Sequence, residues 1–276
     1  MDLTVAAPAD AAPGEHEIRG TFIAQGREYR VGYDLVDYPH ISPHHLYSPA
    51  AVRVQVLDVD VRDVRVGYVN GAGDGVPEAM DQLGVEWEAL DAAHLASGDL
   101  DRFDVIITGI RAYEVRPDLV SHNQRLLDWA RRGGTLIVQY NKYEFPTGDF
   151  APWPVTMSRP HGRVTNPAAP VTVLEPEHPI LTRPNRIGRA DWEGWVQERG
   201  LYFLESWDGP LTPLLAMSDP GEDPLTGSLV TAPLGQGHYV YTGLAFFRQL
   251  PAGVPGAYRL LANLISFGAP EGGGDD

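Results

Sequence analysis

Hydrophobic residues follow two different patterns along the chain, and the change falls near residue 62. Between residues 18 and 62 they recur at every second position, as in REYRVGYDL, where Tyr29, Val31 and Tyr33 alternate with other residues. The stretch AAVRVQVLDVDVR alternates in the same way. A period of two is typical of β-strands, and about three strands fit here, whereas a free-standing β-sandwich has about seven. We therefore predict a short β appendage, the end of a β-sandwich segment.

From Val64 onward, short apolar runs alternate with turns and helices. VRVGYVN, FDVIITGI and TLIVQY are apolar almost throughout, as expected for strands buried on both faces. RPDLVSHNQRLLDWARRGG has the pattern of a helix that begins at Pro117 and ends at the glycine pair 133–134. This alternation predicts an α/β fold with a mostly parallel sheet and helices on both faces. Later strand candidates are PVTVL, GLYFLES, PLLAMS, GSLVTAPL and GHYVYTGL, and GAYRLLANLISF is the last helix.

These patterns predict four parts: a flexible lead-in (1–17), the β appendage (18–62), an α/β domain (63–268) and a flexible tail (269–276). The lead-in is rich in Ala and Pro and lacks the basic region and apolar core of a signal peptide. No apolar run reaches the ~18 residues of a membrane span, so we expect no membrane insertion. The compartment is left open.

Composition excludes several classes of function. The formal net charge is −16, which disfavours nucleic acid and anionic membranes as partners. The chain contains no cysteine, so it has no disulfides, no thiolate catalysis and no Cys-ligated metal.

The turn GAGDG (71–75) raises the possibility of dinucleotide binding, because Asp91 follows about 20 residues later. The glycines are spaced G-x-G-x-G, however, so the third cannot serve helix packing. We interpret the turn as a tight connection in which Asp74 caps the helix, with a small anion at that helix as the alternative.

His40, His44 and His45 lie in the segment HISPHH, whose prolines exclude helical ligand spacing. We interpret this segment as a loop that packs on the α/β domain, with a metal site as the alternative. We predict no metal and no cofactor.

Two strand ends carry unusual polar residues. GIRAYEVRPD and GGTLIVQYNKYEF each leave an apolar strand directly into charged and aromatic residues. Carboxyl ends of parallel strands meet at one edge of a sheet, where ligands bind. The predicted ligand-binding residues there are Arg111, Tyr113 and Glu114 from the first strand end, and Asn141, Tyr143 and Glu144 from the second.

The segment PNRIGRADWEGWVQERGLYF mixes tryptophans with charges, as a sugar-binding wall would. The alternative is that its charges pair with one another and order a long loop. Further wall residues predicted for the same cleft are Asn185, Arg186, Trp192, Trp195 and Arg248.

Several long motifs together resemble one family. They are YPHI-x-P-x-HLY-x-PA, GIRAYE-x-RPDL, GGTL-x-VQYN-x-YEF, HP-x-L-x-x-PN-x-I, DW-x-GWVQERGLYF and TGLAFFRQLPAGVPGAYRL. From about Tyr29 to Phe267 the chain resembles the C-terminal region of large bacterial PIG-L (LmbE-like) deacetylases. That resemblance implies a flavodoxin-like, class I glutamine-amidotransferase-like fold behind a β-sandwich segment. It also implies that a zinc-dependent N-acetyl-sugar deacetylase domain lies upstream in a parent protein, and whether that parent is exported is left open.

The same resemblance places a nucleophilic Cys of the amidotransferase fold at the end of the strand GGTLIVQYN. Tyr140 and Asn141 stand there, so no Cys-His-Glu triad carries over. We therefore predict a non-catalytic accessory domain that binds carbohydrate or supports the absent catalytic domain. In it, Arg111 would hold a carboxylate or phosphate, the tyrosines would stack on a sugar and Asn141 would fix a hydroxyl.

Two alternatives remain at this point. The domain could be a hydrolase in which Glu114 and Glu144 act as an acid/base pair, which requires a raised pKa at one carboxyl. It could also be purely structural and dock onto its upstream partner through surfaces closed by internal salt bridges.

Overall fold

The computed structural model describes residue 8 and residues 10–269. It divides the chain into two compact units, unit 1 (Met1–Asp58) and unit 2 (Val59–Asp276). The boundary therefore falls a few residues before the predicted one at 62. Residues 1–7 and 9 of the predicted lead-in and all of the predicted tail except Ala269 lie outside the described residues.

Unit 1 consists of three two-stranded antiparallel ladders, β1–β6, β2–β3 and β4–β5. The predicted strands are present, but there are twice as many as expected, and the first begins inside the predicted lead-in. HISPHH is also not entirely a loop, because His44 and His45 lie in β5. The strands are β1 (Gly14–Arg19), β2 (Phe22–Ala24), β3 (Arg27–Tyr29), β4 (Val31–Val36), β5 (His44–Pro49) and β6 (Ala51–Val56).

None of the apolar side chains described in unit 1 is fully buried, and many of the large ones are exposed. In the ladder β4–β5, Tyr33 pairs with Tyr47, and the exposed fractions of these two residues are 60% and 72%. Their rings lie 6.1 Å apart. The alternation seen in the sequence thus marks the two faces of each ladder, as a period of two requires. Neither Tyr33 nor Tyr47 is buried, however.

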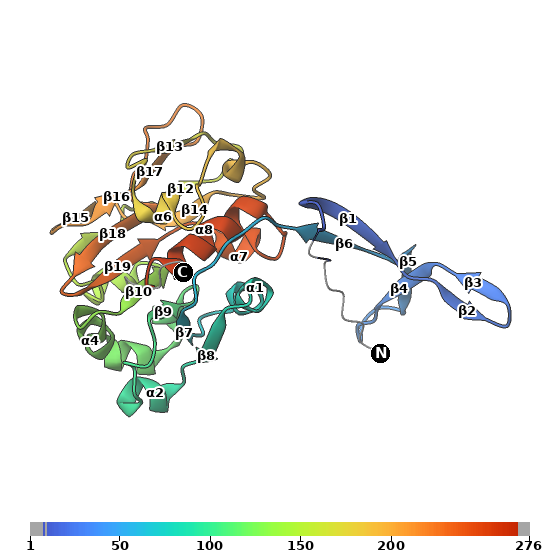
Figure 1. Ribbon diagram of the computed structural model, residues 1–276, viewed down its shortest axis with the longest axis horizontal. Helices are drawn as coiled ribbons and strands as arrows, with labels where there is room; N and C mark the ends of the chain where they lie inside the picture. The colour runs from blue at the N-terminus through green and yellow to red at the C-terminus, as the bar shows by residue number, and fades with distance from the viewer. Residues whose placement is uncertain (1–7, 9, 270–276) are drawn as a thin grey trace. The chain divides into compact units, whose positions relative to one another are not determined.

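Unit 2 is built on a seven-stranded mixed sheet in the order β16-β18-β19-β10-β9-β7-β8 (Figure 1). The pairings from β8 to β19 are parallel, and those that join β18 to β19 and β16 to β18 are antiparallel. The prediction of an α/β fold with a mostly parallel sheet is confirmed. The strands are β7 (Arg65–Val69), β8 (Glu86–Ala89), β9 (Val105–Thr108), β10 (Thr135–Gln139), β16 (Thr212–Pro213), β18 (Leu229–Leu234) and β19 (Gly237–Thr242).

Helices lie on both faces of this sheet. Trp129 and Ala130 of α4 belong to the same core cluster as Leu136 of β10. On the other face, Gly268, just beyond α8, approaches the side chain of Thr135. Neighbouring strand residues point to opposite faces, so the two helices flank the sheet. The helices are α1 (Val76–Leu83), α2 (Ala92–Ser97), α3 (Ala112–Val115), α4 (Pro117–Arg131), α5 (Glu144–Thr147), α6 (Pro179–Thr182), the 3-10 helix η1 (Arg189–Trp192), α7 (Phe246–Gln249) and α8 (Pro255–Ser266).

Between α5 and β18 the chain forms small antiparallel ladders beside the main sheet (Figure 1). This is the Pro-rich stretch in which the sequence shows few periodic runs. The pairs are β11 (Val155–Thr156) with β15 (Ser206–Trp207), β12 (Gly162–Val164) with β14 (Gly200–Phe203), and β13 (Val171–Val173) with β17 (Leu215–Met217).

Candidate functional site

The carboxyl ends of β9 and β10 meet, as the sequence predicts. The backbone N–H of Arg111 donates to the carbonyl oxygen of Tyr140 at 3.0 Å. Both residues are in the left-handed region, with φ of 55° at Arg111 and 37° at Tyr140. Tyr202, at φ 56°, comes from β14 and has its ring 5.5 Å from that of Tyr140. We name the side chains around this meeting point the strand-end cluster: Arg111, Glu114, Tyr140, Lys142, Tyr143, Arg159, His161 and Tyr202.

Glu114 is the centre of an ion-pair network in this cluster. Its carboxylate accepts from Arg111 Nε at 2.5 Å and from Lys142 Nζ at 2.6 Å. These two hydrogen bonds lower the pKa of Glu114 from 4.5 to about 2. The carboxyl therefore remains ionised at neutral pH, and Arg111 is already engaged by a carboxylate of its own chain.

The lowered pKa of Glu114 predicts a pH-dependent contribution to stability. This contribution is complete above the unfolded-state pKa of 4.5 and disappears as pH falls from there toward about 2. Because the side chain is 28% exposed, solvent screening limits it to about 1 kcal/mol. We expect Glu114→Gln to lower the free energy of unfolding at pH 7 by that amount and to lower it less at pH 2, where the carboxyl is about half protonated in the folded state.

Urea unfolding at both pH values would measure this difference. Glu205→Gln is the control, since Glu205 is exposed and has no ion pair among the described residues. An equal loss at pH 7 and pH 2 would contradict an electrostatic role for Glu114.

Aromatic rings form the other half of the strand-end cluster. Tyr202 packs against His161 at 4.5 Å and Tyr143 at 6.0 Å between ring centroids. The guanidinium of Arg159 lies 4.0 Å from the centre of the Tyr143 ring. All three rings are half-buried, so they combine apolar surface with polar atoms that solvent still reaches.

Two predicted ligand-binding residues lie in the interior instead. Tyr113 is 3% exposed, and its hydroxyl donates to Asn123 Oδ1 at 2.7 Å. Asn141 is fully buried: its Oδ1 accepts from the N–H of Tyr113 at 3.2 Å and its Nδ2 donates to the carbonyl of Gln139 at 2.9 Å. This corrects the prediction that they contact a ligand, because their polar atoms hold the two strand ends together.

Glu144 lies at the start of α5, and its Oε1 accepts from the N–H of Lys142 at 3.2 Å. Within the proposed acid/base pair, Glu114 has a lowered pKa, whereas a general acid would need a raised one. The network around Glu114 thus favours a binding role over a catalytic one.

The further wall residues predicted for the cleft do not lie together in the structure. Trp192 and Trp195 are buried, and Trp195 Nε1 donates to the carbonyl of Asp191 at 3.0 Å. Asn185 is 4% exposed and bonds Asn263 in α8, while Arg186 is exposed and 3.8 Å from Glu177. None of these four side chains contacts the strand-end cluster through an interaction identified among the described residues.

Arg248 does lie near the cluster. It is paired with Glu198 at 2.8 Å and covers the ring of Phe247, which is 5.0 Å from that of Tyr140. Burial and the charge of Glu198 raise the pKa of Tyr140, so its phenol stays protonated.

Five residues of the cluster were not predicted as ligand-binding: Tyr140, which was placed only at the position of the missing nucleophile, and Lys142, Arg159, His161 and Tyr202. Lys142 stands between two predicted residues and could have been included on that ground. The other three come from the irregular segment and from β14, and the chain pattern contains no signal that brings them to this edge.

In the turn between β7 and α1 (residues 71–75), the polar side chain of Asp74 is fully engaged by hydrogen bonds within the protein. Asp74 accepts from the Tyr68 hydroxyl and, at 2.9 Å, from the N–H of Ile110. It also accepts from the N–H of Val76 at 3.1 Å, although Gly75 is the N-cap of α1. Asp91 caps α2 by accepting from the N–H groups of Ala93 and His94. Both carboxylates thus serve the fold, which disfavours dinucleotide binding.

Among the described residues, no group of three or more His, Cys, Asp or Glu side chains is arranged to hold a metal ion. Within the same residues, no helix combines the length and the apolar character needed to cross a membrane.

No protein-family model and no curated protein matches the chain. Similar solved structures include the cytoplasmic protein STM1381 from Salmonella typhimurium LT2, with a TM-score of 0.48, 13% identity and coverage of 73% of this chain and 98% of that one. The cytoplasmic protein STM3548 from Salmonella typhimurium has a TM-score of 0.44 and 16% identity, with 92% of this chain and 95% of that chain covered. A β-galactosidase from Rahnella sp. R3 has a TM-score of 0.44 and 15% identity, with 78% of this chain and 33% of that chain covered. At such scores these similarities carry no argument about function.

Proposed function

We propose that unit 2 is a non-catalytic accessory domain that binds carbohydrate at the strand-end cluster, within a protein of the PIG-L deacetylase type. The observation that carries this proposal is the combination of half-buried Tyr143, His161 and Tyr202 rings with the Arg111–Glu114–Lys142 network. Flat rings stack on the apolar faces of sugars, and fixed charged groups bond hydroxyls.

The finer fold assignment is part of this proposal. The parallel strands follow the order β8-β7-β9-β10-β19, which is the second-first-third-fourth-fifth arrangement of flavodoxin-like sheets. This order supports the amidotransferase-like class that the sequence resembles. In such a fold Tyr140 occupies the place of the nucleophile, and a phenol kept protonated by burial is a poor nucleophile.

Titration calorimetry with N-acetylglucosamine and its short oligomers tests the proposal. We expect the wild-type chain to bind, and Tyr143→Ala to weaken binding about five- to tenfold, as the loss of one ring stack would. Tyr33→Ala is the matched control, because Tyr33 is an exposed tyrosine of unit 1. If no sugar binds the wild type, the carbohydrate proposal fails and a docking role beside the upstream catalytic domain takes its place.

A further inference from the structure

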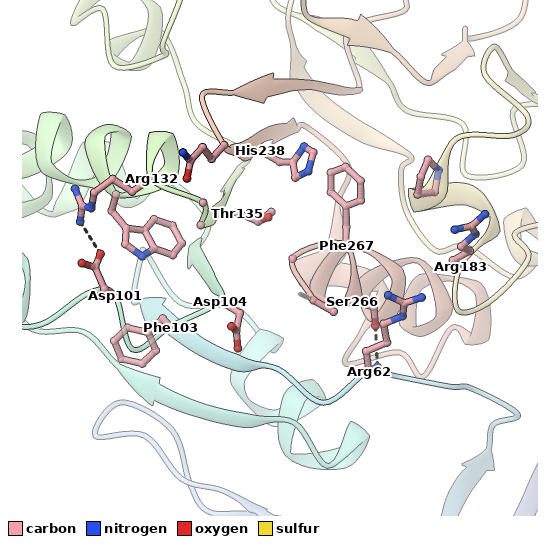
Figure 2. A pocket seen from close by; sticks show the side chains of 17 residues that line it. Arg62, Asp101, Phe103, Asp104, Arg132, Thr135, Arg183, His238, Ser266 and Phe267 are labelled. Carbon is pink, nitrogen blue, oxygen red and sulfur yellow. Dashed lines mark hydrogen bonds and ion pairs between the residues drawn. The ribbon is translucent and has the colours of Figure 1, made fainter. Parts of the chain in front are cut away.

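A cavity lies at the opposite edge of the sheet from the strand-end cluster. It has a volume of about 1170 Å³ and is lined by residues at the amino-terminal ends of β10 and β19, among them Thr135 and His238. Arg183, which follows α6, and Phe267 and Gly268, which follow α8, contribute to its wall (Figure 2). All of these residues belong to unit 2.

Two arginines of this cavity have no anionic partner of their own. No hydrogen bond or ion pair links the guanidinium of Arg62 or of Arg183 to any described residue, and both side chains line the cavity. The third arginine, Arg132, is neutralised by Asp101 at 2.6 Å. Unpaired arginines are notable in a chain with 37 acidic and 21 basic residues.

A buried hydroxyl is the second, independent feature. Thr135 is 1% exposed and lines the cavity, and its Oγ1 has no hydrogen-bond partner among the described residues. Figure 2 shows this hydroxyl directed toward Phe267. Because this oxygen lies in the cavity lining without a partner from the described residues, it is available to donate to an acceptor on a ligand.

Two acidic side chains, Asp101 and Asp104, also line the cavity. Asp104 uses one carboxylate oxygen to accept from the N–H of Arg65 at 2.8 Å, and Asp101 is paired with Arg132. Two unpaired guanidinium groups therefore stand against one partly engaged carboxylate. The unpaired charges of the cavity lining are therefore positive on balance, which favours an anionic ligand.

We propose that this cavity binds a phosphate-type oxyanion carried by a small organic molecule. A guanidinium group can donate two parallel hydrogen bonds to the oxygens of one phosphate. The Thr135 hydroxyl is a further donor in the cavity lining. The ring of Phe267, tilted by 42° against that of His238 with the ring centroids 4.4 Å apart, offers an apolar surface for the organic part. This site is independent of the sugar-binding edge.

Calorimetry with inorganic phosphate, phenyl phosphate and phenol tests the proposal on the full chain. We expect phosphate to bind, phenyl phosphate to bind more tightly and phenol not to bind. Arg62→Ala and Arg183→Ala should each weaken phosphate binding about tenfold or more, and Thr135→Val about fivefold. Both arginines are exposed, so their removal should leave the fold intact even if Thr135→Val does not.

Arg186→Ala is the matched control, because Arg186 is an exposed arginine outside the cavity. We expect it to change phosphate affinity less than twofold. Failure of phosphate to bind at millimolar concentration would overturn the proposal, as would equal weakening by Arg186→Ala and Arg183→Ala. Neither result would affect sugar binding at the strand-end cluster, so the two proposals fail separately.

Discussion

Replacing Asn263 with leucine is expected to lower the free energy of unfolding of unit 2 by about 4 kcal/mol. Asn263 is fully buried in α8, where its Oδ1 accepts from the N–H and the Nδ2 of Asn185, both at 2.9 Å. Its Nδ2 donates to the carbonyl oxygens of Ile180 at 2.9 Å and Asn185 at 2.6 Å. Leucine has a similar volume but leaves three groups without a partner, namely the N–H and the carbonyl of Asn185 and the carbonyl of Ile180, whereas Asn185 Nδ2 still donates to the carbonyl of Asp60 at 2.7 Å. Each buried unsatisfied group costs about 1–3 kcal/mol before relaxation.

Denaturant unfolding followed by tryptophan fluorescence would measure this loss. All six tryptophans lie in unit 2, so the signal reports that unit alone. Asn70→Leu is the control, since Asn70 is exposed and its side chain makes no hydrogen bond among the described residues. A loss below about 1 kcal/mol for Asn263→Leu would mean that water satisfies the groups left behind.

Replacing Gly71 with alanine is expected to cost about 3 kcal/mol or more. A Cβ at this position would lie 2.0 Å from the carbonyl oxygen of Ile110, where two strand ends approach each other. The N–H of Ala72 donates to that same carbonyl at 2.8 Å, so a shift that relieves the clash also breaks a hydrogen bond. The three atoms nearest to the added Cβ all belong to the backbone of Gly109 and Ile110, so no flexible side chain can move away to relieve the clash.

The same fluorescence measurement applies, with Gly188→Ala as the control. At Gly188 the nearest atom to an added Cβ is Asp191 Oδ2 at 4.0 Å, so we expect a change below about 1 kcal/mol. If Gly71→Ala and Gly188→Ala lowered the free energy of unfolding equally, the cost at Gly71 would come from the general loss of backbone freedom and not from the clash with the Ile110 carbonyl.

The sheet could be predicted because its signals are local. Each buried strand is an apolar run of four to six residues that ends at a turn, and α4 begins at a proline and stops at a glycine pair. The meeting of the strand ends at Arg111 and Tyr140 follows from the same alternation, since parallel strands place their carboxyl ends together.

The directions of individual side chains at that edge could not be predicted. The left-handed conformations of Arg111 and Tyr140 turn the chain sharply, and Tyr113 and Asn141 then point inward. Nothing in the residue types shows this, because arginine and tyrosine rarely adopt positive φ.

The cavity at the other edge was missed for a different reason. Arg62, Thr135 and Arg183 lie far apart in the sequence, and no spacing or periodicity in the chain links the three positions. Only the packing of α6 and α8 against the strand starts brings them together.

The positive φ angles of Arg111, Tyr140 and Tyr202 have a consequence for protein engineering. Glycine adopts this conformation without the cost of about 1 kcal/mol that a residue with a Cβ bears. At the buried Tyr140 the loss of ring packing would outweigh this gain. At the partly exposed Arg111, stability-driven redesign would select glycine and, in doing so, remove the guanidinium that pairs with Glu114. Thermostability and the proposed ligand recognition are therefore in conflict at Arg111, so stabilising substitutions are better sought elsewhere in the chain.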